Sequence, residues 1–210
     1  MSLLRLDFSL FPDASAGAEI ANLVEAEWTA AHPGEPVVRR NPGTDPLPAD
    51  AWALATTAAT TPEPDHSPAQ REAFALAGTL AGELAGADAV LLAVPLYNFG
   101  VSQHFKTWVD LVITGAGGPN PILEGKPAVL VTVRGGGYGP GAPREGWDHS
   151  TAFLTRIIAD VWQADLTVIE RELTLAATTP GMESLRDQAA RSHAEALAAA
   201  RKTSLTPAAG

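Results

Sequence analysis

Two continuous apolar segments, AVLLAV at 89–94 and AVLVTV at 128–133, restrict the possible folds of this chain more than any other feature. A strand with one face in water alternates apolar and polar residues, and these segments do not. They are typical of strands that are covered on both faces, as in a parallel sheet. The sequence therefore predicts an α/β domain in which helices cover both faces of a sheet.

Further strands and helices are expected from the periodicity of apolar residues. The expected strands are 3–8, 36–40 and 166–173, and the last of these alternates enough to lie at a sheet edge. The expected helices are about 15–32, 68–86, 102–114, 149–163 and 181–202. Strands that alternate with helices indicate parallel pairing with right-handed crossovers. The pattern fits a doubly wound three-layer fold, and the length fits one domain over 1–210.

One segment interrupts this alternation. Residues 41–67 contain five prolines and no sustained period. We expect a long surface excursion here. The alternative is a lid or a subunit contact, because long loops without regular structure are uncommon in compact domains and are often functional.

Charge and composition exclude several functions. The chain has 14 basic and 24 acidic residues, a net charge of −10, so phosphate backbones are repelled and no nucleic-acid partner is expected. It has no cysteine, which excludes thiolate chemistry. No apolar run approaches the roughly 18 residues of a membrane-spanning helix. No secretion signal is recognised at the N-terminus. We expect a cytoplasmic protein with no membrane partner and, since its histidines show no ligand spacing, no metal site.

In open parallel sheets, ligands bind at the carboxyl ends of the strands, where the strand order reverses. Unusual sequences follow three of the expected strands: FSLFPDASAGAE at 8–19, PLYNFG at 95–100 and RGGGYGPGAP at 134–143. These three loops should converge on one crevice.

The first loop lacks G-x-G-x-x-G, so a dinucleotide site of the Rossmann type is not supported. Instead, Ser9 and the run Ser15–Gly17 place hydroxyls and small residues where a helix should begin. Free N–H groups and the positive end of a helix dipole suit a phosphate. The alternative is that Ser15 serves only as an N-cap.

The other two loops suit a flat ligand with a polar edge. Tyr97 and Phe99 lie upstream of the expected helical core stripe and are free to line such a ligand, although a turn with buried rings is the alternative. The glycines at 135–137 let the main chain approach a ligand closely, although a glycine-rich surface loop is the alternative. A phosphate cradle, an aromatic shelf and a peptide clamp together match a phosphorylated flavin.

The run PLYNFGVSQHFKTWVD at 95–110 resembles the motif P-M-Y-N-F-N/G-x-S-x-x-L-K-x-Y/W-x-D of the FMN-dependent NADH-azoreductases, which are flavodoxin-like quinone and azo-dye reductases. TVRGG at 132–136 is similar to the T-S-R-G-G of that family, and Ser9 with Ser15–Gly17 is similar to its phosphate loop. The resemblance implies a flavodoxin-like sandwich with a five-stranded parallel sheet. It also implies a homodimer with active sites at the subunit interface, which the apolar Trp52 and Leu54 within 41–67 support.

The resemblance further implies an FMN-dependent NAD(P)H oxidoreductase that reduces quinones or azo compounds by two-electron hydride transfer. Its donor is NADH or NADPH, and the sequence leaves that choice open. The implied cofactor-binding residues fall in the three loops: Ser9, Ser15, Ala16 and Gly17 at the phosphate; Leu96, Tyr97, Asn98 and Phe99 at the ring; Val133, Arg134, Gly135 and Gly136 at its pyrimidine side.

Some positions depart from the family pattern. Asp160 and Trp162 stand where the family usually has Phe and Gly, which predicts an altered acceptor pocket; a core-filling role for Trp162 is the alternative. Tyr138 stands where a histidine is often found and is either a proton donor to the acceptor or a structural tyrosine. The rival functions are a flavodoxin-like electron carrier, a pathway-specific flavin reductase of one metabolite, and a binding protein without flavin.

Overall fold

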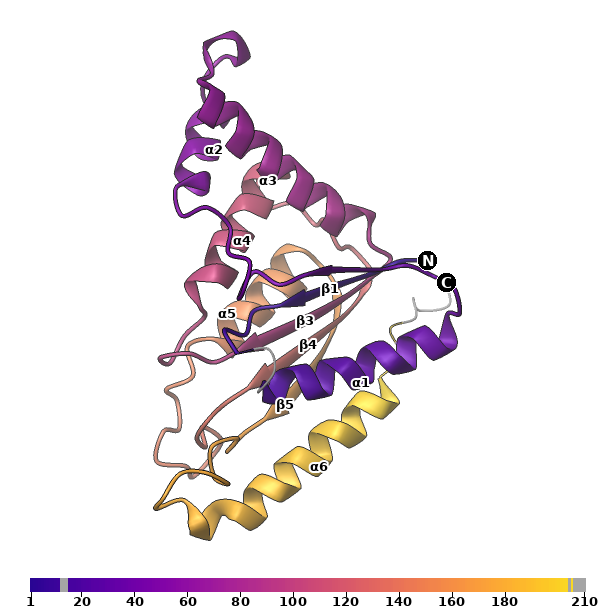
Figure 1. The fold of residues 1–210 in the computed structure, drawn as a ribbon, viewed down its shortest axis with the longest axis vertical. Helices are drawn as coiled ribbons and strands as arrows, with labels where there is room; N and C mark the ends of the chain where they lie inside the picture. The colour runs from indigo at the N-terminus through magenta and orange to yellow at the C-terminus, as the bar shows by residue number, and fades with distance from the viewer. Residues whose placement is uncertain (12–14, 204, 206–210) are drawn as a thin grey trace.

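A five-stranded parallel sheet lies between two layers of helices in this computed structural model, which describes residues 1–11, 15–203 and 205 (Figure 1). The strand order is β2-β1-β3-β4-β5, so the direction in which strands are added reverses at β1. The doubly wound parallel sheet predicted from the sequence is confirmed. The strands are β1 (Leu3–Asp7), β2 (Val37–Arg40), β3 (Ala89–Pro95), β4 (Pro127–Val133) and β5 (Asp165–Arg171).

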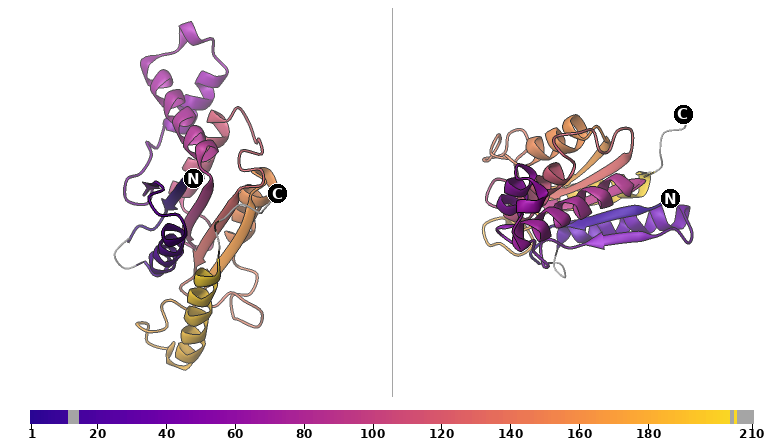
Figure 2. Two further views of the ribbon diagram at one scale, coloured as in Figure 1. Left: turned by 90° about the vertical axis from the view of Figure 1, so that its right-hand side faces the viewer. Right: turned by 90° about the horizontal axis from the view of Figure 1, so that it is seen from above.

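The helices form two apolar clusters with the sheet, one on each face (Figure 2). One face is covered by α1 (Ala16–Ala31) and α6 (Arg186–Lys202). The other is covered by α2 (Ala51–Ala59), α3 (Pro68–Gly86), α4 (Gln103–Gly115) and α5 (Thr151–Thr155), which a π-helical segment, η3 (Arg156–Val161), continues. Two short 3₁₀ turns complete the elements, η2 (Glu63–Asp65) and η4 (Glu183–Leu185).

The two central strands, β3 and β4, are buried at every residue. Their side chains alternate between the clusters, so that Leu91 and Val129 face α1 while Leu92 and Leu130 face the opposite layer. The expectation that these strands are covered on both faces is confirmed. By contrast, β2 and β5 form the edges of the sheet and are largely exposed, as predicted for β5.

The helix after β3 has the predicted core stripe. Phe105, Trp108, Val109 and Val112 are all buried, and the ring of Phe105 meets Phe8 of the first loop edge to face at 5.0 Å. The helix begins at a capping serine, because the Ser102 hydroxyl accepts a hydrogen bond from the Phe105 N–H at 3.2 Å. The chain therefore leaves β3 through a short loop that is fixed at both ends.

The proline-rich segment 41–67 corrects the expectation of an excursion without regular structure. It contains α2, whose Ala51, Ala55 and Ala58 are buried against α3 and α4. Their i, i+4, i+7 spacing is that of an amphipathic helix. Alanine is so weakly apolar that this stripe does not stand out in the sequence. Leu54 packs at the edge of the core, whereas Trp52 is exposed.

Two helix boundaries also differ from the prediction. The helix expected over 149–163 is α-helical only to Thr155 and then widens into η3. The last helix starts at Arg186 rather than near Gly181, after the turn η4. Part of the tail expected beyond it, at 204 and 206–207, lies outside the described residues.

Gly115, the last residue of α4, tests the close approach of α3 and α4. A Cβ atom at Gly115 would overlap the carbonyl group of Ala77 in α3, so Gly115→Ala should force the helices apart and lower the free energy of unfolding by about 1–3 kcal/mol. Urea unfolding measures this. The control is Gly82→Ala, at an exposed position of α3 where a Cβ meets nothing within 4 Å, and it should stabilise by about 0.5–1 kcal/mol. Equal stability of the two variants would contradict the packing.

Candidate functional site

The three loops predicted to converge do meet at the carboxyl ends of the strands (Figure 1). The Leu10 N–H in the first loop donates to the Tyr97 hydroxyl in the second at 3.2 Å. The His149 N–H, in the segment after β4, donates to the carbonyl of Phe99 at 2.9 Å. Gly17, in the first turn of α1, lies against Val133 at the end of β4. The loops after β1, β3 and β4 are thus neighbours at one edge of the sheet, and the surface that they share is called the crevice.

The first loop brings small and hydroxyl residues to the start of α1. The Ser15 hydroxyl caps the helix by accepting from the Ala18 N–H at 3.2 Å, and the Ser9 hydroxyl accepts from the Phe11 N–H at 3.2 Å. Across the described part of the chain, the N–H groups of Ala16 and Gly17 have no hydrogen-bond partner. Free amides at a helix N-terminus suit an anion. The N-cap role of Ser15 is confirmed, and the phosphate site stays a prediction. Residues 12–14 of this loop lie outside the described structure.

A residue that the sequence analysis missed supports this loop from behind. Gly43 follows β2, and a Cβ atom there would overlap the carbonyl oxygen of Ser9. Its N–H lies 3.4 Å from the carbonyl oxygen of Asp7 at the end of β1. The loop after β2 can therefore pack against the first loop only through a glycine.

The second loop is a two-residue turn in a strained conformation. Tyr97 and Gly100 exchange hydrogen bonds of 3.2 and 3.0 Å, and the residues between them, Asn98 and Phe99, have φ values of 48° and 70°. This is the pattern of a type I′ turn, which favours Asn-Gly. A phenylalanine with positive φ costs roughly 1–3 kcal/mol, and such strain clusters at functional sites.

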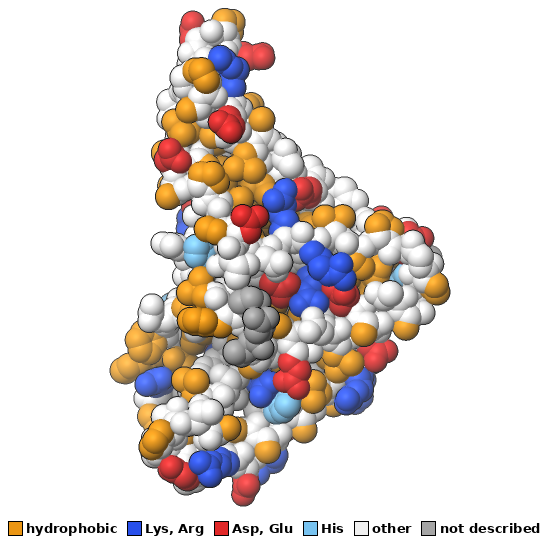
Figure 3. Space-filling view, viewed as in Figure 1, with side chains coloured by type: hydrophobic (Ala, Val, Ile, Leu, Met, Phe, Trp, Pro, Cys, Tyr) orange, Lys and Arg blue, Asp and Glu red, His pale blue; other side chains and the backbone are white. Residues whose placement is uncertain are grey.

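This turn presents its side chains to solvent. Phe99 is 40% exposed, Asn98 is exposed, and Leu96 and Tyr97 are half-buried. The alternative for this loop was a turn with buried rings. The turn is present, but the rings of Tyr97 and Phe99 are not buried. Exposed apolar side chains gather along this side of the molecule (Figure 3). Those in or beside the loops at the carboxyl ends are Leu10, Phe11, Phe99, Trp147 and Leu175.

The glycine loop turns its carbonyl groups toward the segment that follows β5. The carbonyls of Gly135 and Gly136 accept from the N–H groups of Leu175 and Leu173, both at 3.2 Å. The N–H groups of the same two glycines make no hydrogen bond within the described residues, so they are available to a ligand. Neither glycine has a positive φ. A Cβ atom at Gly135 would lie 2.8 Å from the Leu175 side chain, so a larger residue there would require Leu175 to move.

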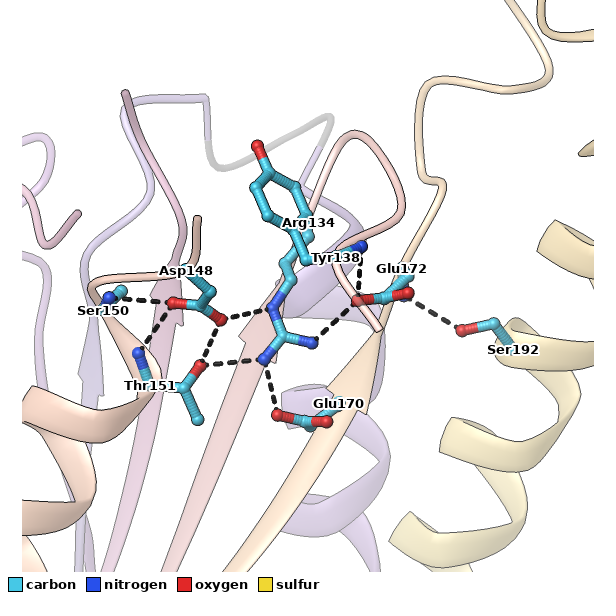
Figure 4. A network of polar contacts seen from close by, with 8 residues as sticks. All are labelled: Arg134, Tyr138, Asp148, Ser150, Thr151, Glu170, Glu172 and Ser192. Carbon is cyan, nitrogen blue, oxygen red and sulfur yellow. Dashed lines mark hydrogen bonds and ion pairs between the residues drawn. The ribbon is translucent and has the colours of Figure 1, made fainter. Parts of the chain in front are cut away.

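Arg134, at the start of this loop, is enclosed by acidic side chains (Figure 4). It is only 6% exposed. Its Nε lies 2.7 Å from Asp148 Oδ2, and its two Nη atoms donate to Glu170 at 2.6 Å and to Glu172 at 3.1 Å. The Thr151 hydroxyl accepts a further hydrogen bond at 2.8 Å. The Arg134 cluster, defined as these five residues, fastens the loop after β4 to β5 and α5.

The cluster shifts the pKa values of its members toward the charged forms. Burial alone would lower the pKa of Arg134, but the hydrogen bond to Glu170 and the surrounding carboxylates outweigh it and raise that pKa. Burial alone would raise the pKa of Asp148. Its hydrogen bonds from Thr151 and the Ser150 N–H, with the charge of Arg134, lower that pKa instead.

The cluster bears on the predicted flavin contact of Arg134. Its guanidinium is occupied by carboxylates, its N–H donates to Arg171 and its carbonyl accepts from Thr174. The arrangement favours a structural role, so direct contact with a flavin stays a prediction that the geometry does not support. A cavity of about 530 Å³ lies beside the Arg134 cluster, and its lining includes Glu195 in addition to the three carboxylates of the cluster. Its negative charge is unsuited to a phosphate. A second cavity nearby has about 460 Å³.

Asp160 and Trp162 lie away from the loops at the carboxyl ends of the strands, so the geometry does not favour the acceptor pocket, which stays a prediction. Both lie near the end of η3, where the chain turns back into the first residues of β5, so they are at the amino ends of the strands. Trp162 is 1% exposed and packs edge to face on Trp108 at 5.5 Å, as the core-filling alternative proposed. Asp160 is exposed and pairs with Arg156 at 2.7 Å.

Tyr138 lies within the crevice loops, half-buried. Its N–H donates to Glu172 at 3.0 Å, and its ring lies 5.9 Å from the guanidinium carbon of Arg144. Its role as proton donor or structural tyrosine stays untested. Arg144 and Trp147 were missed by the sequence analysis, because only the path of the loop brings them to Phe99.

Groups of three or more His, Asp or Glu side chains placed to hold a metal ion are absent from the described residues. Over the same part of the chain, every helix is too short or too polar to cross a membrane.

Comparisons with known proteins agree with this fold. A family model described as the flavodoxin-like fold matches residues 1–202. A protein of Frankia casuarinae named FMN-dependent NADH:quinone oxidoreductase is 38% identical over 204 residues, which cover 95% of this chain and 96% of that protein. A Streptomyces avermitilis protein of the same name is 35% identical over 199 residues, covering 93% and 91%.

Solved structures show the same arrangement. An azoreductase from Bacillus anthracis str. Sterne superposes with a TM-score of 0.77 at 20% identity, covering 96% of this chain and 97% of that one. An FMN-dependent NADH-azoreductase from Bacillus anthracis str. Ames Ancestor, solved in complex with FMN, superposes with a TM-score of 0.71 at 13% identity, covering 95% and 100%. At these identities the matches show the fold alone, and the flavodoxin-like fold expected from the sequence is confirmed.

The Arg134 cluster predicts a dependence of stability on pH. Because folding lowers the pKa of Asp148 from its ordinary 3.8, the ionised carboxylate stabilises the fold above that value, and the contribution disappears as the pH falls through the folded pKa. Asp148→Asn should lower the free energy of unfolding by about 1–3 kcal/mol at pH 7. The difference in the free energy of unfolding between this variant and the wild type should become smaller below about pH 4.

Urea unfolding at several pH values measures this dependence. Asp160→Asn is the matched control, since it removes an exposed i, i+4 partner of Arg156 and should cost less than about 0.5 kcal/mol. If Asp148→Asn costs no more than Asp160→Asn at pH 7, the cluster does not hold the loop.

Proposed function

This chain belongs to the family of proteins with the flavodoxin-like fold, and from that premise we propose that it is an FMN-dependent NADH:quinone oxidoreductase that also reduces azo compounds. The names of its relatives support the activity. The observation that carries the proposal is the grouping of the three loops. It brings an exposed, strained Phe99 turn together with helix N-terminal amides and glycine amides that have no hydrogen-bond partner among the described residues.

The residues present fit FMN. The amides of Ala16 and Gly17 beside the Ser15 hydroxyl suit its phosphate, because a helix N-terminus attracts anions. Phe99 and the half-buried Tyr97 offer apolar surface to its ring system. The amides of Gly135 and Gly136 suit its pyrimidine oxygens.

Bound FMN would supply two-electron chemistry between NADH, as the hydride donor, and a quinone or azo acceptor, which would also take up protons. The chain would bind FMN, orient it and stabilise its reduced form. The Tyr97 hydroxyl, by accepting from the Leu10 N–H, ties the ring side of the crevice to the phosphate side. The N–H groups of the glycine loop are preorganised, since their carbonyls are fixed by Leu173 and Leu175, and preorganised donors stabilise developing negative charge.

We also propose a homodimer in the cytoplasm, with the active site at the subunit interface. The support is the row of exposed apolar side chains along the crevice, among them Phe99 and Trp147, together with the exposed Trp52 of α2. Such patches are typical of interaction sites. Light scattering at micromolar concentration should give twice the chain mass of 21.8 kDa. The monomer mass would contradict the dimer and leave the flavin proposal intact.

The function is tested first with the wild type. The purified protein, mixed with FMN and freed of excess, should keep the yellow flavin spectrum and oxidise NADH continuously when a quinone is supplied. A protein that is reduced once by NADH but does not turn over would be an electron carrier. A protein that retains no flavin would overturn the proposal.

The phosphate site is tested by Ser15→Ala. The variant should bind FMN about tenfold more weakly, through the loss of one hydrogen bond to a charged group, while its affinity for riboflavin, which has no phosphate, stays unchanged. Fluorescence quenching measures both affinities. Ser67→Ala is the matched control, because Ser67 caps α3 with a hydrogen bond of the same length, 3.2 Å, and both variants should lose about 1 kcal/mol of stability. Equal FMN affinity in the two variants would show that Ser15 does not bind the phosphate.

A further inference from the structure

Arg144 lies beside residues of both the turn after β3 and the glycine loop after β4. Its guanidinium carbon is 5.9 Å from the centroid of the Phe99 ring and 5.9 Å from that of Tyr138. One of its terminal nitrogens would lie 3.1 Å from a Cβ atom placed on Gly136. The cation therefore sits over the glycine loop, between it and the strained turn after β3.

The charge of Arg144 is not compensated by its neighbours. Its side chain makes no hydrogen bond or ion pair with the described residues, in contrast to Arg134, whose charge three carboxylates neutralise. The acidic residues of the same loop are engaged elsewhere. Glu145 accepts from the Gly141 N–H at 2.8 Å, and Asp148 belongs to the Arg134 cluster. In a chain of net charge −10, an arginine that has no charged partner among the described residues thus lies beside these loops.

The position of Arg144 is held by the surrounding structure. The ring of Phe99 also packs edge to face on Trp147 at 5.7 Å, and the backbone after Trp147 is fastened by the hydrogen bond from the His149 N–H to Phe99. Cation–π contacts with Phe99 and Tyr138 favour a guanidinium between the two rings. The cation is therefore placed by the fold, although its side chain is exposed.

We propose that Arg144 contacts the pyrimidine edge of bound FMN and stabilises its reduced form, an inference that rests on the proposed function. Reduction by two electrons and one proton places negative charge on the pyrimidine ring of a flavin. The amides of Gly135 and Gly136, which have no partner among the described residues, would serve that edge as neutral donors, and Arg144 would add a full positive charge beside them. Arg144 therefore raises the reduction potential of the bound flavin by binding the reduced form more tightly than the oxidised form.

The test compares reduction potentials of the FMN-loaded wild type and three variants, measured spectroscopically against a reference dye. Arg144→Gln should weaken the binding of reduced FMN relative to oxidised FMN about tenfold, which lowers the two-electron potential by about 30 mV. Arg144→Lys keeps the charge and should restore most of the difference. Arg201→Gln is the matched control, since it removes an exposed charge in the last turn of α6, at the opposite end of the sheet (Figure 1), and should leave the potential unchanged.

Salt provides a second readout that a structural role would not change. Because Arg144 is exposed, high ionic strength should screen its charge and bring the wild-type potential toward that of Arg144→Gln, whose own potential should respond less. Equal potentials in wild type and Arg144→Gln at low salt, with FMN bound and NADH turned over in both, would overturn the inference and leave the function standing. Loss of affinity only for anionic acceptors would also overturn it. Failure of the wild type to bind FMN would instead overturn the proposed function.

Discussion

Burial of β3 and β4 on both faces is the constraint on which the rest of the structure depends. Because both faces of these strands must be covered by helices, the chain has room for functional backbone only where strands end. The reversal of strand order at β1 then places the loops after β1 and β3 side by side at the carboxyl ends of the strands, where ligands of such sheets bind. The position of the candidate site is thus a consequence of core packing, and the chemistry is supplied by loops that contribute little to the core.

Those loops are kept in place by two unlike devices. On the β5 side, the buried Arg134 cluster fastens the glycine loop through charge, with three carboxylates around one guanidinium. On the β1 side, the backbone of Gly43 packs closely against Ser9 and holds the first loop without any charge. Between them, the Phe99 turn is strained and is held by hydrogen bonds from both neighbouring loops. A rigid frame around a strained element is expected where a ligand must be met by a fixed surface.

The sequence predicted the parts of this structure that depend on apolar periodicity or on a local motif. The strands, the α4 stripe with Phe105, the Ser102 cap and the convergence of three loops belong to this group. It could not predict α2, because a stripe of alanines carries little hydrophobic signal. Nor could it assign Arg134 to a cluster or Trp162 to the core, since those roles depend on carboxylates and a tryptophan far away in the chain.

The two open edges of the sheet bear on how the protein avoids aggregation. An exposed strand can pair with the edge of another molecule and start a continuous sheet. Here β5 carries Glu170 and Arg171, and the two arginines of β2 are tied to Glu25 and Glu83. Charges on both outer strands disfavour pairing between sheets, so copies of this chain are left to associate through helices and loops. The protein can then reach a high concentration without polymerisation along its strands.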